Sequence, residues 1–408
     1  MNKKILILLN FLCLINVYSQ TDKIDLKKIN NINSITEKFN NNLIVGLGEG
    51  THGTKDFNDI RINISKNLIQ KQNFTIIAFE QAFGDSYFLN KGINSDQNIK
   101  NLMRDNLLSI WQTKEFEDFF LWIREYNLKS KNKIIITGFD VNLLNNSSKV
   151  LKERIKNYDN NYLNEINKID SLSLKIDESW LQSNNPNFEV NMKDLIKFGT
   201  EGYLITKKLD SLYSKDLDPI EKIALTNLQL GFQNFYEANN GNYDFDRDYV
   251  MASNIEKIQK ELNSKIILFA HNAHIANEPT LITGMGKYLK KTYKKNYYAL
   301  ATFSSNGYYS AMTDNIVTKN NDLKSYSLPN PLIDSWEEKL KELSRNDYFI
   351  DFRSNISFPK TSLKLRLFGY APYDESNDKY FTTKPLVVSE IFDGVIFIHN
   401  SKASELLQ

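Results

Sequence analysis

Short apolar runs recur along this chain, separated by stretches whose apolar residues are spaced as on one face of a helix. The short runs are continuous rather than alternating, which is typical of strands buried on both faces. We expect strands at Leu43–Leu47, Thr75–Phe79, Lys133–Gly138, Lys265–Ala270, Tyr297–Phe303 and Gly394–Ile398. We expect helices at Asp59–Gln72, Glu115–Lys129 and Arg247–Leu262. Strands alternating with helices predict an α/β fold with a mostly parallel sheet.

The strand pattern stops in residues 150–240. This segment is polar but carries helical stretches at Lys193–Leu212 and Pro219–Ala238. Aromatic residues within these stretches favour a packed helical insertion over a disordered linker. Residues 320–384 are rich in Pro, Ser, Asp and aromatics, and we expect loops there with a short strand at Tyr348–Phe352, near the mouth of a site.

The N-terminus resembles an export signal. Lys3 and Lys4 precede an apolar run, Ile5–Val17, that is short for a membrane span, and Val17–Ser19 offers side chains of modest size for cleavage. A buried first helix or strand is the alternative. The only cysteine, Cys13, lies in the apolar run, so a cleaved protein has no disulfide or catalytic thiol. We predict export to the periplasm, with a cytoplasmic location as the alternative.

Four parts follow from these patterns: a signal peptide (1–19), a first part of the α/β core (20–149), a helical insertion (150–240) and a second part of the core (241–408). The chain is 41% hydrophobic, which suffices for a large core. Its formal net charge of +2 is too small to indicate nucleic acid as a partner. We expect no stable membrane insertion after signal cleavage, and the sequence sets no oligomeric state.

A glycine-rich loop follows the first expected strand, in the order Gly46-Leu47-Gly48-Glu49-Gly50-Thr51-His52-Gly53. It lacks the Gly-Lys-Ser/Thr ending of a phosphate loop and does not have the spacing of a dinucleotide fingerprint. Glu49 and His52, three residues apart, suit a general base and the carboxylate that orients it. The alternative is a histidine that caps the next helix.

Further polar residues end other expected strands. Glu80 and Asp140 end the second and third strands, and His271 and His274 follow the fourth. A buried glutamate needs a partner, and Arg61 is the natural one for Glu80. In an open α/β sheet, ligands bind beyond the carboxyl ends of the strands, so we expect these side chains to converge on one pocket.

Two common hydrolase signatures are absent from the sequence. It has no G-x-S-x-G nucleophile elbow and no H-E-x-x-H zinc helix. His399 follows the last expected strand without an acidic neighbour close in sequence, and we assign it a structural role. A water molecule activated by a histidine or by a metal is therefore the expected nucleophile.

Taken together, these motifs resemble the erythromycin esterase family, which opens the lactone ring of macrolide antibiotics. The resemblance runs from about Leu43 to Ile398 and rests on the Glu49–His52 loop, on Arg61 and Glu80, and on three further motifs. These are Arg247-Asp248-x-x-Met251-x-x-Asn254, Ala270-His271-Asn272-Ala273-His274 and Phe392-Asp393-x-x-Ile396-Phe397-Ile398.

The resemblance implies a three-layer α/β/α fold with a helical insertion, and hydrolysis without a covalent intermediate, metal or cofactor. It implies that His52 is the base and that the site is lined by Glu49, Arg61, Glu80, His271 and His274. We also assign Asp140 and Arg247 to substrate binding. The expected function is a carboxylic ester hydrolase that confers macrolide resistance.

Two alternatives stay open. The same histidines and glutamates could hold Zn²⁺ in a metal-dependent hydrolase of another ester. A secreted relative that binds haem or iron through histidines is the other alternative.

Overall fold

The computed structural model describes residues 23–25, 29–154, 159–182, 185–314, 316–355, 357–372, 381–382 and 384–407. The predicted signal peptide lies outside them. None of the helices within these ranges has the length and apolar character that a membrane span requires.

The described chain builds one nine-stranded sheet, in which the path β1-β8-β9-β6-β2-β5-β3-β4 is joined by β7 beside β6. The strands are β1 (Lys23–Asp25), β2 (Ile44–Glu49), β3 (Phe74–Ala82), β4 (Ile135–Asp140), β5 (Lys265–His271), β6 (Tyr297–Ala311), β7 (Lys324–Ser327), β8 (Tyr348–Asp351) and β9 (Gly394–Ser401). Neighbouring strands pair in parallel along the part of the sheet with the order β9-β6-β2-β5-β3-β4. The strands β1, β7 and β8 pair antiparallel with their neighbours. This is the mostly parallel sheet that the sequence predicts.

Successive residues of the central strands point to opposite faces of the sheet and enter separate cores. In β5, Ile266 and Leu268 belong to one core, and Ile267 and Phe269 belong to the other. Every one of these side chains is buried. Burial on both faces explains why the strands are continuous apolar runs in the sequence.

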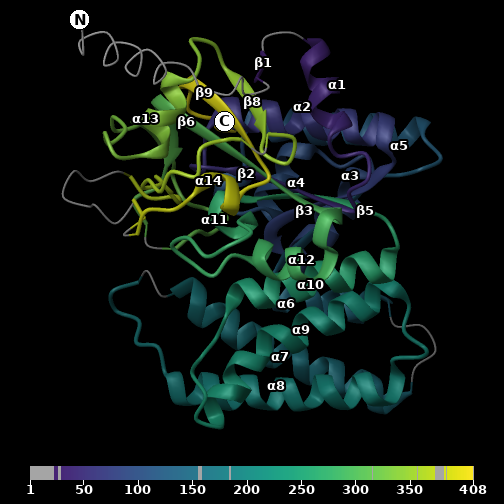
Figure 1. Ribbon diagram of the computed structural model, residues 1–408. Coiled ribbons are helices and arrows are strands. Elements are labelled where there is room, and N and C mark those ends of the chain that lie inside the picture. The colour runs from purple at the N-terminus through teal and green to yellow at the C-terminus, as the bar shows by residue number, and fades with distance from the viewer. Residues whose placement is uncertain are drawn as a thin grey trace, which may run out of the picture.

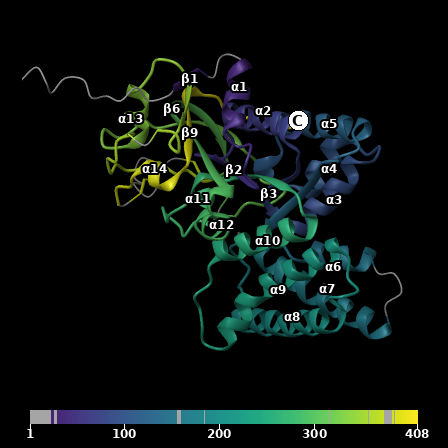
Figure 2. The same ribbon diagram turned by 45° about the vertical axis from the view of Figure 1, so that its right-hand side comes forward.

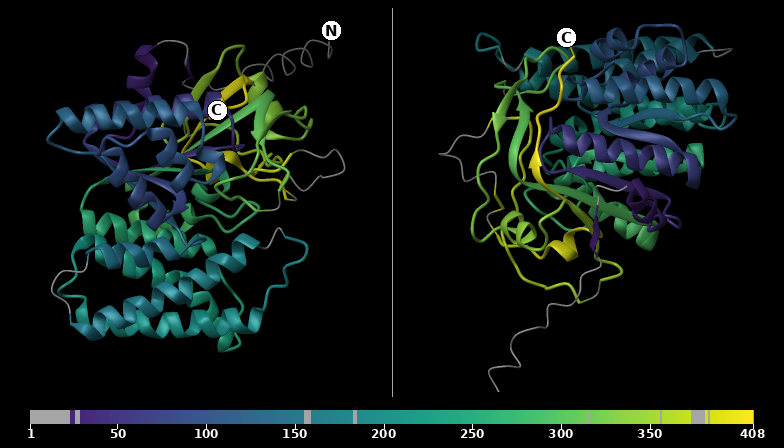
Figure 3. Two further views of the ribbon diagram at one scale, coloured as in Figure 1. Left: turned by 180° about the vertical axis from the view of Figure 1, so that it is seen from behind. Right: turned by 90° about the horizontal axis from the view of Figure 1, so that it is seen from above.

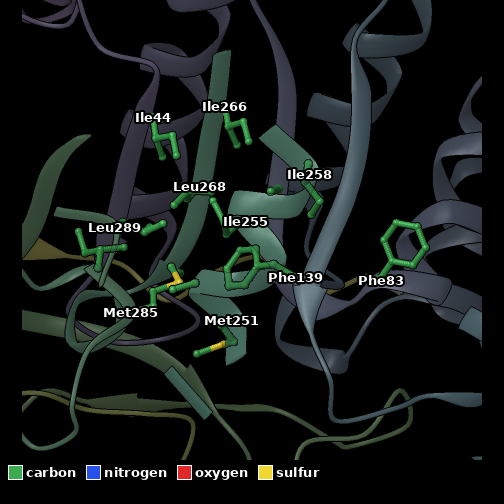
Figure 4. Packing of buried hydrophobic residues seen from close by; sticks show 14 of the residues in the cluster. Ile44, Phe83, Phe139, Met251, Ile255, Ile258, Ile266, Leu268, Met285 and Leu289 are labelled. Carbon is green, nitrogen blue, oxygen red and sulfur yellow. The ribbon is translucent and has the colours of Figure 1, made fainter. Parts of the chain in front are cut away.

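Helices cover both faces of the sheet. Those that contribute to the core around Phe269 are α1 (Ile29–Glu37), α2 (Lys55–Gln72), α4 (Ile99–Asn106) and α5 (Lys114–Lys129). Those on the other side include α10 (Arg247–Leu262) and α12 (Met285–Tyr293). Figure 4 shows Met251, Ile255 and Ile258 of α10 beside Ile266 and Leu268 of β5. Three layers, α/β/α, result.

Four helices, three of them long, extend the α10 side of the molecule. They are α6 (Asn145–Arg154), α7 (Asn160–Leu181), α8 (Met192–Tyr213) and α9 (Pro219–Asn239), and they lie together below the sheet in Figures 1 and 2. The view from behind in the left panel of Figure 3 shows the same layer. Asp218 starts α9 with a capping box, in which its side chain accepts from the backbone of Glu221 and the Glu221 side chain accepts in return.

The remaining helices are short or join the layers. They are α3 (Phe83–Ile93), α11 (Asn272–Ile275), α13 (Trp336–Glu342), α14 (Val388–Ile391) and the 3₁₀ turns η1 (Ser109–Trp111) and η3 (Lys294–Asn296). The six predicted buried strands all form, and each of the five predicted helices forms within a few residues of its expected bounds. The exact borders of the predicted insertion, 150–240, stay a prediction.

The double-sided sheet predicts a large cost for truncating a central strand side chain. Leu268→Ala removes buried methyl groups from the middle of β5, and we expect unfolding to become easier by about 3 kcal/mol. Urea unfolding followed by circular dichroism measures this loss. Leu128→Ala, at a side chain that is 81% exposed, is the matched control and should change little. Equal effects of the two variants would contradict the two-core packing.

Candidate active site

The loop between β2 and α2 carries the first pair of candidate residues. Glu49 ends β2, and His52 follows in a turn that Gly53 completes with a φ of 69°. A Cβ atom on Gly53 would lie 2.2 Å from the Ser310 carbonyl oxygen, so only glycine fits there. Nδ1 of His52 is 2.8 Å from Oε1 of Glu49. Because a carboxylate only accepts, the neutral imidazole carries its proton on Nδ1 and its lone pair on Nε2.

A buried arginine holds the other oxygen of Glu49. Nη2 of Arg61, on α2, donates to Oε2 of Glu49 at 2.7 Å, and the guanidinium lies over the Phe269 ring. Glu49 and Arg61 are each only 1% exposed. Burial disfavours the Glu49 carboxylate, but Arg61 and the hydrogen bond from His52 outweigh it and lower the pKa of Glu49. Glu49 is therefore a fixed negative charge behind His52.

A second histidine lies between two carboxylates. Nε2 of His274 is 3.1 Å from Oε1 of Glu80, and Nδ1 is 2.6 Å from Oδ1 of Asp248. Burial alone would lower the pKa of His274, but Glu80 and the hydrogen bond to Asp248 raise it to about 9. His274 is therefore an imidazolium at neutral pH, and the pKa of Glu80 lies well below its ordinary value because His274 outweighs burial.

His271 has the opposite character. It is the N-cap of α11, where Nδ1 accepts from the Ala273 backbone N–H at 3.3 Å. Nε2 donates to the Phe368 carbonyl oxygen at 2.6 Å. Burial and the nearby His52 and His274 lower the pKa of His271 to about 4, so this ring is neutral. The His271 and His52 ring centroids are 5.3 Å apart.

Arg247, at the start of α10, connects the ends of two strands. Its Nε donates to Oδ1 of Asp140 at 3.1 Å, and Nη2 contacts both Asp140 and Glu80. Glu80 also accepts from the His271 backbone N–H at 3.0 Å. A network of charged groups therefore joins the carboxyl ends of β3, β4 and β5.

One cavity of about 700 Å³ opens onto these residues. Its polar floor contains the side chains of His52, Glu80, Asp140, Arg247, His271 and His274. Its wall is mostly apolar and comes from the helical layer and from three segments on the sheet side: Leu108, Ile110, Leu144, Ile176, Trp180, Val190, Met192, Leu195, Phe235, Phe245, Ile316, Val317 and Tyr370. A cavity of this size and character suits a small organic molecule.

The four ring nitrogens of His271 and His274 are poorly suited to a metal. Both nitrogens of His274 face carboxylates, and both nitrogens of His271 are hydrogen-bonded to backbone groups. Within the described ranges, no three His, Cys, Asp or Glu side chains are grouped as metal ligands. The donor set therefore does not fit the zinc site considered above.

The structure brings the predicted residues together but corrects one pairing. Arg61 does not pair with Glu80 as we expected; it pairs with Glu49, because α2 runs back beneath the end of β2. The partners of Glu80 are His274 and Arg247. Arg61 and Glu49 lie behind His52 and are not part of the cavity wall.

Several residues of the site were not among the predicted ones. Asp248 orients His274, and the Phe368 carbonyl orients His271. The Trp111 ring meets His52 edge-on with centroids 6.2 Å apart. Asp248 lies next to Arg247 in the motif on α10 and was within reach of sequence reasoning, whereas the other two carry no signal in the sequence. His399 lies apart, bound to Asp347 and to the Ser344 carbonyl.

The charge on His274 predicts how stability changes with pH. A pKa raised from 6.5 to about 9 means that the folded state holds this proton more tightly, so the stabilisation is complete below pH 6.5 and disappears as the pH rises through about 9. The expected loss is about 3 kcal/mol for this group. Urea unfolding of the wild type and of His274→Gln across this range measures it. A wild-type slope as shallow as that of the variant would contradict the buried imidazolium.

Comparison with known proteins gives a consistent result. The model of the erythromycin esterase family matches residues 69–401, which include Glu80, Asp140, Arg247, His271 and His274. YbfO of Bacillus subtilis (strain 168), which is described as a hydrolase, is 25% identical over 90% of this chain and 85% of its own length.

Two erythromycin esterases are also similar. Erythromycin esterase type II of Escherichia coli is 24% identical, over 89% of this chain and 91% of its own. A solved structure, a mutant of the erythromycin esterase EreC in its open conformation, superimposes with a TM-score of 0.69 at 17% identity, over 93% of this chain and 96% of its own. Since the family model spans most of the sequence, this chain belongs to the erythromycin esterase family, and that membership supports a hydrolase.

Proposed function

We propose that this protein is a carboxylic ester hydrolase that opens the lactone of a macrolide such as erythromycin, with water as the nucleophile. The observation that carries the proposal is the lone pair of His52. Nδ1 is occupied by Glu49, and Nε2 has no hydrogen-bond partner among the described residues while the ring borders the cavity. A water molecule in the cavity is then within reach of a general base.

Each proposed role follows from a contact. Nε2 of His52 removes a proton from water, and Glu49 stabilises the imidazolium that forms. Arg61 holds Glu49 in place rather than touching the substrate, because it lies behind the cavity wall. Asp140 and Arg247 border the cavity and would contact the substrate.

The positive side of the cavity would stabilise the charge of the transition state. When hydroxide attacks the lactone carbonyl, negative charge develops on the carbonyl oxygen. The His274 imidazolium and the Arg247 guanidinium border the same cavity and are held by Glu80, Asp140 and Asp248. Such preorganised charge in a buried site is worth a factor of about 10²–10³ in rate.

The leaving alkoxide needs a proton. Both N–H groups of His274 point at carboxylates, and the Nε2–H of His271 points at a carbonyl. His52 is left with a proton taken from water and faces the cavity, so we assign it the second transfer as well. The lactone C–O bond breaks, the ring opens to an acid and an alcohol, and one water molecule is consumed.

Size and polarity support a large apolar ester. The cavity of about 700 Å³ falls inside the range of small-molecule sites. The helices α7, α8 and α9 supply Trp180, Leu195 and Phe235 to the cavity wall, and we propose that these side chains determine which ester binds. In a cell exposed to a macrolide, this reaction would open the ring of the antibiotic. We therefore propose that the protein is exported and confers macrolide resistance.

The first prediction concerns the base. His52→Ala should lose turnover by a factor of about 10²–10⁴ while remaining folded. Mass spectrometry of erythromycin incubated with purified protein detects the gain of one water. His399→Ala, a histidine away from the cavity, is the control and should match the wild type. Wild-type turnover in His52→Ala would remove His52 from the mechanism.

The second prediction concerns the alkaline side of the pH profile. The pKa of His274 is raised to about 9, so the cation is present below that pH and lost above it. We expect kcat/KM to fall as the pH rises through about 9, because the oxyanion then loses a positive neighbour. His274→Gln should be slow and should lack this alkaline step. A variant that keeps the step would show that another group titrates there.

A further inference from the structure

The C-terminal tail, Lys402–Leu407, lies against the loop that carries His52. After β9, the Lys402 carbonyl accepts from the Lys55 N–H at 2.8 Å, and the Ser404 N–H donates to the Gly53 carbonyl at 2.8 Å. The Glu405 carbonyl accepts from the Lys114 N–H at 2.7 Å. Figure 2 shows the C-terminus between α2 and α5, the two helices whose starts these bonds fix. The tail therefore joins the His52 loop to both helices.

One side chain of the tail also enters the interior. Oγ of Ser404 accepts from Nδ2 of Asn58 at 3.0 Å. Oδ1 of Asn58 accepts from Nη2 of Arg61, and the same Nη2 donates to Oε2 of Glu49. Glu49 in turn holds Nδ1 of His52. A continuous chain of hydrogen bonds thus runs from Ser404 to the imidazole of His52.

Every member of this chain is buried. Ser404 is 5% exposed, Asn58 is 1% exposed, and Arg61 and Glu49 are each 1% exposed. Water cannot replace a missing partner there, so losing one group leaves a buried donor or acceptor unpaired. Hydrogen bonds in a connected buried network also strengthen one another. Nε and Nη1 of Arg61 donate to the Phe57 and Leu47 carbonyls, so the position of Nη2 depends on its own two acceptors, Asn58 and Glu49.

We propose that Ser404 and Asn58 are positioning residues for His52, and that the C-terminal tail is part of the machinery that aims the proposed base. The proposal rests on the proposed function, because it assigns His52 the role of base. Asn58 accepts one hydrogen bond from Arg61 Nη2 and thereby limits where Nη2 can meet Glu49. Arg61 only donates, so the oxygen of the Asn58 amide faces it, and Ser404 accepts from the nitrogen on the other side and holds the amide in that position.

Neither residue borders the cavity, and this separates positioning from binding. A substrate in the cavity touches neither Ser404 nor Asn58, so removing their side chains should leave KM unchanged. Misplacing a catalytic group by a fraction of an ångström lowers kcat instead. The expected signature is a loss confined to kcat.

The test uses Ser404→Ala in the full chain. We expect kcat to fall about tenfold at constant KM. Ser65→Ala is the matched control, because Ser65 is also buried, lies on α2 together with Asn58 and Arg61, and donates to the Arg61 backbone carbonyl rather than to the guanidinium network. Both variants are assayed at a temperature where circular dichroism shows each fully folded. A loss in Ser404→Ala that equals the loss in Ser65→Ala would overturn the proposal.

A second measurement is independent of any substrate. The Nδ1–H proton of His52, bonded to Glu49, gives a downfield proton NMR signal that His52→Ala identifies by its disappearance. We expect this signal to shift or broaden in Ser404→Ala and to stay in place in Ser65→Ala. An unchanged signal in Ser404→Ala would overturn the proposal even if the wild type hydrolysed every ester tried. If no ester is hydrolysed, the proposed function fails while this signal still decides the positioning role.

A double-mutant cycle shows whether the two residues act through one chain. Asn58→Ala removes both hydrogen bonds, so adding Ser404→Ala to it should lower kcat no further. Two merely structural defects would multiply instead. Multiplying losses in the double variant would overturn the proposal.

Discussion

The Glu49 carboxylate, buried between Arg61 and His52, is the interaction on which the rest of the site depends. A carboxylate that is 1% exposed persists only if its charge is matched, and Arg61 provides that match at 2.7 Å. The second oxygen is then free to fix the His52 tautomer. Without the arginine, burial would favour the neutral acid, and the imidazole would lose the group that orients it.

The number of carboxylate partners distinguishes His52 from His274. His52 has one carboxylate partner and keeps a nitrogen facing the cavity, whereas His274 has two and holds a positive charge. His271 contacts neutral backbone groups and stays uncharged. In the proposed mechanism, His52 is the base and His274 is the cation that faces the developing charge, and both border one cavity. The three histidines therefore differ in the groups that they contact, not in residue type.

Much of this arrangement could be predicted from the sequence. Continuous apolar runs mark strands buried on both faces, and polar residues at their ends converge because the strands are parallel. Glu49, His52, Glu80, Asp140, His271 and His274 are found this way. The resemblance of the motifs to a family added the fold layers and the expected chemistry.

The rest could not be predicted because it depends on packing across the chain. The predicted pairing of Arg61 with Glu80 was wrong because the path of α2 in the folded structure decides which carboxylate Arg61 meets. The Phe368 carbonyl and Ser404 are invisible in a pattern, since a backbone oxygen has no residue type and a serine near a terminus has no period. In the sequence, the residues of α7, α8 and α9 that line the cavity cannot be distinguished from the apolar face of an ordinary amphipathic helix.

The roles of the two histidines are tested most directly by the protonation state of each imidazole nitrogen, read from ¹⁵N chemical shifts of protein with ¹⁵N-labelled histidine in mildly alkaline solution. We expect the neutral His52 ring to carry its proton on Nδ1 and none on Nε2, and His274 to carry a proton on both nitrogens. A neutral His52 ring with its proton on Nε2, or a neutral His274 at a pH below its pKa of about 9, would contradict these roles.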